Sequence, residues 1–134
     1  MKTNVKWMLF IVSIFFITSC FNPQEKEEVV STADFSKYIS GHTANIISNR
    51  SGIRVILTDT LSQQQIAGIN MDKLFTFYPG IKGETKIYNQ QEVVFTPKKP
   101  LPSNTAYKCK FHLDKVIGVE KEKKTFVFQF TTRK

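Results

Sequence analysis

The chain has 134 residues, with 19 Lys and Arg against 11 Asp and Glu, and therefore a formal net charge of +8 at pH 7. This length allows one compact domain and not two, because domains usually hold roughly 100 to 150 residues. The sequence contains only two cysteines and two histidines. That number excludes a disulfide framework and the cysteine-rich and histidine-rich zinc sites.

Residues 1–19 have the layout of a secretory signal peptide. Lys2 and Lys6 supply a positive flank, and an apolar run follows from Trp7 to Ile17. Two small residues then precede Cys20. The apolar run is shorter than the roughly 20 residues that a helix needs to cross a hydrocarbon core, so a cleaved signal is favoured over a permanent membrane span.

Cys20 is predicted to become the lipidated N-terminus of the mature protein. The segment from Ile17 to Cys20 resembles the lipobox of bacterial lipoproteins, where cleavage precedes the cysteine and its thiol forms the thioether. Acyl chains such as palmitate contribute about 0.8 kcal/mol per buried methylene, and several chains give near-permanent anchoring. Phe21 follows the cysteine. By resemblance to lipoprotein sorting signals, this favours the outer membrane, with the domain facing the periplasm or the cell surface.

Residues 20–33 are predicted to be a flexible tether, because they contain too few apolar residues to build a core. The acidic residues Glu25, Glu27 and Glu28 serve the solubility of this tether, or act as the surface-export signal that some bacterial lipoproteins carry at this place. Without residues 1–19 the chain has 17 basic and 11 acidic residues. Because the lysines are dispersed along the sequence, we interpret them as a solvated surface and not as a nucleic-acid site.

Residues 34–134 are predicted to form an all-β domain, because short runs of alternating apolar and polar residues are separated by Pro and Gly. The positions expected to face inward are Ile53, Val55, Leu57, Phe75, Phe77, Val93, Phe95, Tyr107, Cys109, Phe111, Leu113, Phe126, Phe128 and Phe130. Those expected to face outward are Arg54, Ile56, Lys108, Lys110, His112, Val127 and Gln129. The expected fold is a β-sandwich, with a loop or short helical turn over Asp59–Asp72.

The segment Val93–Tyr107 resembles bacterial Ig-like domains. It contains an apolar strand that ends in Phe-Thr-Pro, a Pro-Leu turn, and a Thr-x-Tyr that opens the next strand. The closing segment Phe126–Thr132 is similar to the Phe-x-Phe-x-Thr ending of such domains. The resemblance implies an Ig-like β-sandwich of about seven strands, in which the Tyr107 ring covers one end of the core while its hydroxyl stays hydrated.

A wider match is similar to the N-terminal domain of bacterial alpha-2-macroglobulin lipoproteins. It is carried, in chain order, by Phe35–Ser40, Ile46–Ser48, Ile53–Val55, Phe75–Gly83 and His112–Val116. The resemblance implies a membrane-anchored protease inhibitor whose large shell closes around a protease that has cut its bait region. Further macroglobulin-type domains or a protease would then be its partners.

This chain departs from that family in two ways. It has no bait region, and it has no Cys-x-Glu-Gln thioester, because Lys110 follows Cys109. We therefore expect the N-terminal domain or a truncated form of such an inhibitor, with a structural or interaction role and no trapping by itself. The alternative is a stand-alone surface lipoprotein that binds a glycan or a protein through its Ig-like domain.

No catalytic, cofactor or metal site is predicted, and the chain is not expected to be an enzyme. His112 is expected on the outward face without a nucleophile, base and orienter set, and His42 in a loop without a carboxylate near it in sequence. The charge runs Lys98-Lys99 and Glu120–Lys124 are interpreted as solvated turns, with docking of a partner or of an anionic glycan as the alternative. Outward Arg54 and Ile56 would mark a face that neighbouring domains cover in a longer relative.

Overall fold

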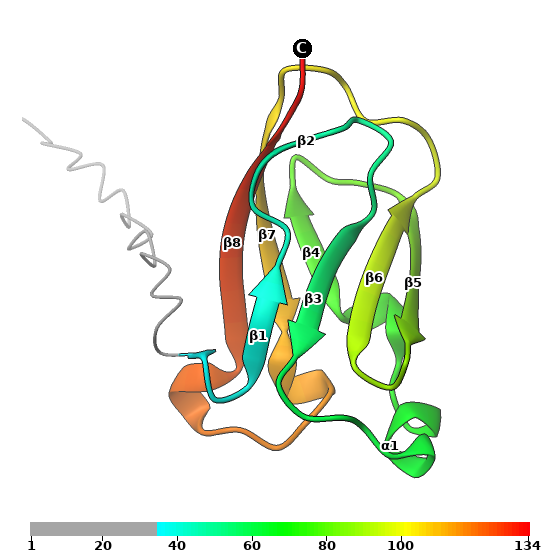
Figure 1. Ribbon diagram of the computed structural model, residues 1–134, viewed down its shortest axis with the longest axis vertical. Coiled ribbons are helices and arrows are strands. Elements are labelled where there is room, and N and C mark those ends of the chain that lie inside the picture. The colour runs from blue at the N-terminus through cyan, green and yellow to red at the C-terminus, as the bar shows by residue number, and fades with distance from the viewer. Residues whose placement is uncertain (1–34) are drawn as a thin grey trace, which may run out of the picture.

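The computed structural model describes residues 35–134, which form a sandwich of two four-stranded sheets (Figure 1). The strand order is β1-β3-β6-β5 in one sheet and β2-β8-β7-β4 in the other. The strands are β1 (Ile39–His42), β2 (Asn45–Ile47), β3 (Ile53–Leu57), β4 (Phe75–Tyr78), β5 (Gly83–Tyr88), β6 (Glu92–Pro97), β7 (Ala106–His112) and β8 (Thr125–Thr132). The helical segments are α1 (Gln63–Ala67) and the 3-10 turns Met71–Lys73, Leu113–Lys115 and Lys121–Lys123. The predicted signal peptide, Cys20 and the tether lie outside the described residues.

The strand order confirms the all-β sandwich and has the immunoglobulin arrangement. The first strand of that arrangement is split into β1 and β2, so that each sheet contains one half of it and three further strands. β1 pairs antiparallel with β3, whereas β2 pairs parallel with β8. The chain therefore crosses from one sheet to the other between His42 and Asn45. This crossing explains why the sandwich has eight strands where about seven were predicted.

The core lies between the sheets and contains the residues that the alternation predicted, together with Ile39, Leu61, Leu74, Leu101 and Val116, which it did not predict. Ile53, Val55, Val93 and Phe111 are fully buried. Of the predicted inward positions, only Phe75 is half-buried, since β4 is an edge strand. Burial of each large apolar side chain contributes about 1.5–3 kcal/mol, so the aromatic core supplies most of the driving force for folding.

One outward position differs from its prediction. Val127 lies on the outer face of β8 by alternation, but it is only 4% exposed. Its neighbours on that face are Lys110 across the strand pair and Gln129 two residues on. Side chains longer than valine on both sides reduce its exposure, so the expectation that Val127 faces water was wrong.

The segment Asp59–Asp72 contains a short helical turn, as predicted. Ser62 caps α1: its hydroxyl accepts a hydrogen bond from the backbone N–H of Gln65 at 3.1 Å, and the Gln65 side chain accepts one from the backbone N–H of Ser62 at 2.8 Å. This reciprocal capping box satisfies N–H groups that a helix start otherwise leaves unpaired. It lets a helix of five residues form.

The loops of the sandwich gather at two opposite ends (Figure 1). We call the end that carries the C-terminus the C-terminal end; it consists of residues 48–52, 79–82, 98–105 and 133–134. The N-terminal end carries the first described residue, Phe35, and consists of residues 35–38, 58–74, 89–91 and 113–124.

Candidate binding site at the C-terminal end of the sandwich

The C-terminal end carries basic side chains without acidic ones. Its loops contain six exposed basic side chains and no Asp or Glu. The six are Arg50, Lys82, Lys98, Lys99, Arg133 and Lys134. The ion pairs found among residues 35–134 join Lys37 to Glu120, Arg54 to Glu92 and Lys86 to Glu84. None of these pairs uses the six cations, so their charges remain available to a ligand.

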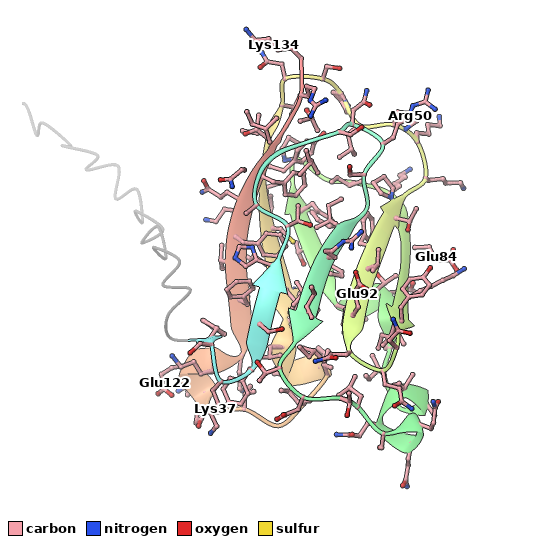
Figure 2. All side chains as sticks on the ribbon, in the orientation of Figure 1. Lys37, Arg50, Glu84, Glu92, Glu122 and Lys134 are labelled. Carbon is pink, nitrogen blue, oxygen red and sulfur yellow. The ribbon has the colours of Figure 1, made fainter. Side chains whose placement is uncertain are left out.

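Acidic side chains occur elsewhere on the domain. Figure 2 shows Arg50 and Lys134 at the C-terminal end, whereas Lys37 and Glu122 lie together at the opposite end and Glu84 and Glu92 lie along the side of the sandwich. The N-terminal end mixes both signs, with acidic side chains at Asp59, Asp72, Asp114, Glu120 and Glu122. The positive potential of the domain is therefore concentrated at one end.

A pocket opens between two turns of the C-terminal end. It has a volume of about 400 Å³ and is lined by the turn at 79–82, by residues 98–102 and by Thr105 and Tyr107. Its apolar lining includes Ile81 and Leu101, while Lys82, Lys98 and Lys99 stand at its rim. A concave apolar site with a few charged groups is the usual form of a small-ligand site.

Hydrogen bonds fix the turns that carry these lysines. The backbone N–H of Lys98 donates to the carbonyl oxygen of Lys82 at 2.8 Å, and the N–H of Leu101 donates to that of Asn49 at 2.8 Å. These two bonds join the three loops that carry Arg50, Lys82 and the Lys98-Lys99 pair. The basic side chains are thus held on a common frame, which lowers the entropy lost when a ligand binds.

A buried hydroxyl anchors the long turn at 98–105 to the last strand. Thr132 is 1% exposed, and its Oγ1 donates to the carbonyl oxygen of Pro102 at 2.6 Å. The same oxygen accepts a hydrogen bond from the backbone N–H of Thr105 at 2.9 Å. Backbone groups of the turn are thereby satisfied inside the protein without using any charge.

Tyr107 forms part of the inner wall of the pocket. It is 3% exposed, and its ring stacks on that of Phe130 with centroids 5.2 Å apart. Burial raises the pKa of the Tyr107 phenol, so the hydroxyl stays neutral at physiological pH. It therefore adds no negative charge to the pocket.

The two histidines lie in environments that the sequence did not indicate. His112 is half-buried, and its Nε2 is 2.8 Å from the Thr76 hydroxyl; burial is the largest cause of its lowered pKa. His42 ends β1 instead of lying in a loop, and its ring packs on Phe126 and Phe128 at 5.0 and 5.1 Å between centroids. Both are structural contacts, and among residues 35–134 no three His, Cys, Asp or Glu side chains are grouped as metal ligands.

The structure also places the remaining residues that the sequence analysis singled out. Cys109 is fully buried, as predicted, and burial strongly raises the pKa of its thiol. Arg54 is exposed and pairs with Glu92 across the sheet at 2.8 Å, while Ile56 is half-buried. The run Glu120–Lys124 contains the 3-10 turn Lys121–Lys123 at the N-terminal end, and its residues are exposed except for the half-buried Lys123. Cys20, the predicted lipidation site, lies outside the described residues.

Sequence reasoning found two of the six cations at the C-terminal end and interpreted them as a solvated turn. It missed Arg50, Lys82, Arg133 and Lys134, because these residues are far apart along the chain. The order of the strands could have grouped these residues, because in an antiparallel sandwich every second connection between strands lies at the same end. Assigning each basic residue to the loop that contains it, and each loop to one end of the sandwich, would have brought the six cations together.

Comparisons with known proteins identify the fold. No family model matches the chain, and no curated protein matches it. A structure of L,D-transpeptidase 3 from Mycobacterium tuberculosis in complex with a faropenem-derived adduct aligns with a TM-score of 0.51 at 8% identity, over 74% of this chain and 39% of that chain. A crystal structure of an L,D-transpeptidase from Mycobacterium tuberculosis H37Rv aligns with a TM-score of 0.52 at 8% identity, over 72% of this chain and 40% of that chain.

This chain thus corresponds to about two fifths of those enzymes. At 8% identity the likeness extends to the fold alone, so both the macroglobulin resemblance and the expectation of no enzymatic activity stay predictions. Within residues 35–134, no helix is both long enough and apolar enough to span a membrane.

Proposed function

We propose that this protein is a membrane-anchored lipoprotein whose Ig-like domain is a non-enzymatic binding module. The observation that carries this proposal is that six cations, which form no ion pair within residues 35–134, gather at one end of the domain. The tether would join the domain at Phe35, at the opposite end. With Cys20 acylated, the N-terminal end would be held toward the lipid. The C-terminal end would then be presented to whatever lies beyond the membrane surface.

The length of the tether sets how far the domain can range. Residues 20–33 would span at most about 50 Å when fully extended, and about 20 Å as a flexible coil. This reach keeps the domain close to the membrane while leaving it free to turn. An anchored module of this kind increases the local concentration of its binding site near the surface.

The surface of the domain favours a module that works alone over one buried in a shell. The large exposed apolar side chains are Ile46, Tyr78 and Tyr88, on β2, β4 and β5. β2 and β4 are the two opposite edges of one sheet, and β5 belongs to the other. Scattered apolar residues are normal for a soluble surface, whereas a covered interface usually shows a contiguous patch.

The second candidate is the N-terminal domain, or a truncated form, of an alpha-2-macroglobulin-like protease inhibitor. It is supported by the ordered matches from Phe35 to Val116 and by the half-buried Ile56, which a neighbouring domain could cover further. The DNA that follows codon 134 separates the two candidates. A reading frame that continues with macroglobulin domains supports the inhibitor, and unrelated genes support the stand-alone lipoprotein.

Lipidation is tested by labelling the chain with an alkyne analogue of palmitate in a bacterial host. We expect label in the wild-type chain, none in Cys20→Ala, and undiminished label in Cys109→Ala, the matched substitution at the other cysteine. The labelled chain should sediment with outer membranes. Label that persists in Cys20→Ala, or a chain that is never acylated, would refute the anchor.

A further inference from the structure

We propose that the C-terminal end binds an acidic polysaccharide, with one sugar unit seated in the pocket that Lys82 and the Lys98-Lys99 pair help to line. This inference deepens the proposed function by naming the class of ligand. Its first support is charge complementarity, since six cations and no acidic side chain occur in the loops of this end. Two or three of these cations would be enough to bind a single small anion. A polymer with repeated negative groups can engage cations that are spread over three loops and residues 133–134.

The pocket distinguishes a glycan from a ligand held by charge alone. Its volume of about 400 Å³ lies in the range of small-ligand sites, and its walls include Ile81, Leu101 and the prolines of both turns. A sugar ring presents C–H groups on its faces and carries its carboxylate or phosphate at the periphery. An apolar wall with lysines at the rim matches that arrangement.

The rim cations are lysines, which favours dispersed anionic groups over one tightly clamped group. Lysine is a mobile point charge on a flexible stem, whereas arginine binds planar anions in a fixed bidentate geometry. The Lys98 N–H donates to the carbonyl oxygen of Lys82, and the turn that carries Lys98 and Lys99 is also held by its bonds to Asn49 and Thr132. The frame is therefore rigid while the charged tips can adjust to successive negative groups of a polymer.

An anionic membrane is the competing partner, and two features argue against it. The tether would attach at the opposite end, so the cations lie at the part of the domain farthest from the point of attachment. The site is also concave, and it takes a ligand group in, whereas a membrane-binding end would insert apolar side chains outward.

The test compares matched probes on the mature chain with Cys20→Ser, which carries no lipid. The probes are neutral dextran, carboxymethyl dextran and dextran phosphate. Binding of each probe is measured by calorimetric titration at low ionic strength. We expect binding to the acidic dextrans only, with amide NMR signals of residues 79–82 and 98–102 shifting most. The preference between the carboxylated and the phosphorylated dextran identifies which anionic group the natural glycan carries.

Charge-matched variants locate the site. Lys98→Glu/Lys99→Glu should weaken binding by about tenfold or more at low salt, while Lys121→Glu/Lys124→Glu, an equal charge change on exposed residues at the N-terminal end, should have little effect. All four side chains are exposed, so folding is preserved. Equal weakening by both variants would show that only net charge matters and would overturn the proposal.

Two further probes set the glycan against other partners. Binding of poly-glutamate as tight as that of carboxymethyl dextran, or tighter binding to phosphatidylglycerol vesicles than to either acidic dextran, would overturn the assignment to a glycan. Because this chain carries no lipid, these results are independent of the labelling experiment. A failed anchor and a failed ligand site would therefore be recognised separately.

Discussion

The two ends of the sandwich use their polar side chains in opposite ways. At the C-terminal end, Thr132 and backbone groups hold the loops, and the basic side chains make no ion pair with described residues. At the N-terminal end backbone hydrogen bonds also hold the loops, but charged side chains add to them: Glu120 accepts a hydrogen bond from the Tyr38 hydroxyl and pairs with Lys37 at 3.8 Å. An end whose shape does not depend on its charges can offer those charges to a ligand.

The largest expected effect is a loss of stability on substituting Gly83, which follows the turn at 79–82 of the C-terminal end. A Cβ at this position would lie 2.3 Å from the carbonyl oxygen of Thr96 and 2.6 Å from the Phe95 ring. Gly83→Ala would force the start of β5 away from β6 and move the neighbouring Lys82 turn. We expect a loss of about 3 kcal/mol in the free energy of unfolding, measured by urea titration followed by circular dichroism.

Gly118 provides the control at the N-terminal end. A Cβ there would meet no atom within 4 Å, and no glycine of the described chain has a positive φ. Gly118→Ala should therefore leave the stability within about 0.5 kcal/mol of the wild type. Equal losses in the two variants would show that the close approach of β5 to β6 does not determine the effect.

Thr132 tests whether buried uncharged bonds hold the C-terminal end. Thr132→Val keeps the shape of the side chain but leaves the carbonyl oxygen of Pro102 and the N–H of Thr105 without their partner. We expect a loss of about 2 kcal/mol that does not change with salt concentration, measured by urea unfolding at low and high salt. The variant should also weaken the binding of acidic dextran, because the turn carrying Lys98 and Lys99 would loosen.

Thr58→Val is the matched substitution at the other end. The Thr58 hydroxyl donates to the Ser36 carbonyl oxygen at 3.1 Å in an exposed position, where water can replace it. Its loss should lower the stability by less than about 0.5 kcal/mol. A loss as large as that of Thr132→Val would contradict the distinction between the two ends.

Local rules predicted most of the fold and little of the site. Alternation alone placed Ile53, Val55, Phe111 and Phe128 in the core, since side-chain direction along a strand has a period of two. Alternation failed at Val127, whose burial depends on neighbours across the sheet. The expectation of a loop failed at His42, whose contact with Phe126 joins residues more than 80 positions apart. Such contacts depend on topology.

The site depended on topology still more. Lys98 and Lys99 were visible as a charge run, but Arg50 and Lys82 join them only because three loops return to the same end. The pocket needs the hydrogen bond from Lys98 to Lys82, which links residues 16 positions apart. No sequence window contains that arrangement, although the Pro-Leu turn itself was visible in the sequence.

The smallest expected effect concerns the exposed contact at the N-terminal end. The hydrogen bond from Tyr38 is the largest cause that lowers the pKa of Glu120 below its usual value of 4.5. Between the folded and the unfolded pKa, the unfolded chain therefore binds more protons than the folded one. The contribution of Glu120 to stability is complete above the unfolded value and is lost as the pH falls through the folded value.

Tyr38→Phe removes the hydroxyl and keeps the ring. We expect the variant to be slightly less stable than the wild type at neutral pH and equal to it in acid, so that its stability changes less between about pH 6 and pH 3. Urea unfolding at each pH measures this slope, and added salt should reduce it because the pair is exposed to water. A slope that stays unchanged in Tyr38→Phe would mean that the charged residues of this end do not hold its loops, and the contrast between the two ends would then rest on the C-terminal end alone.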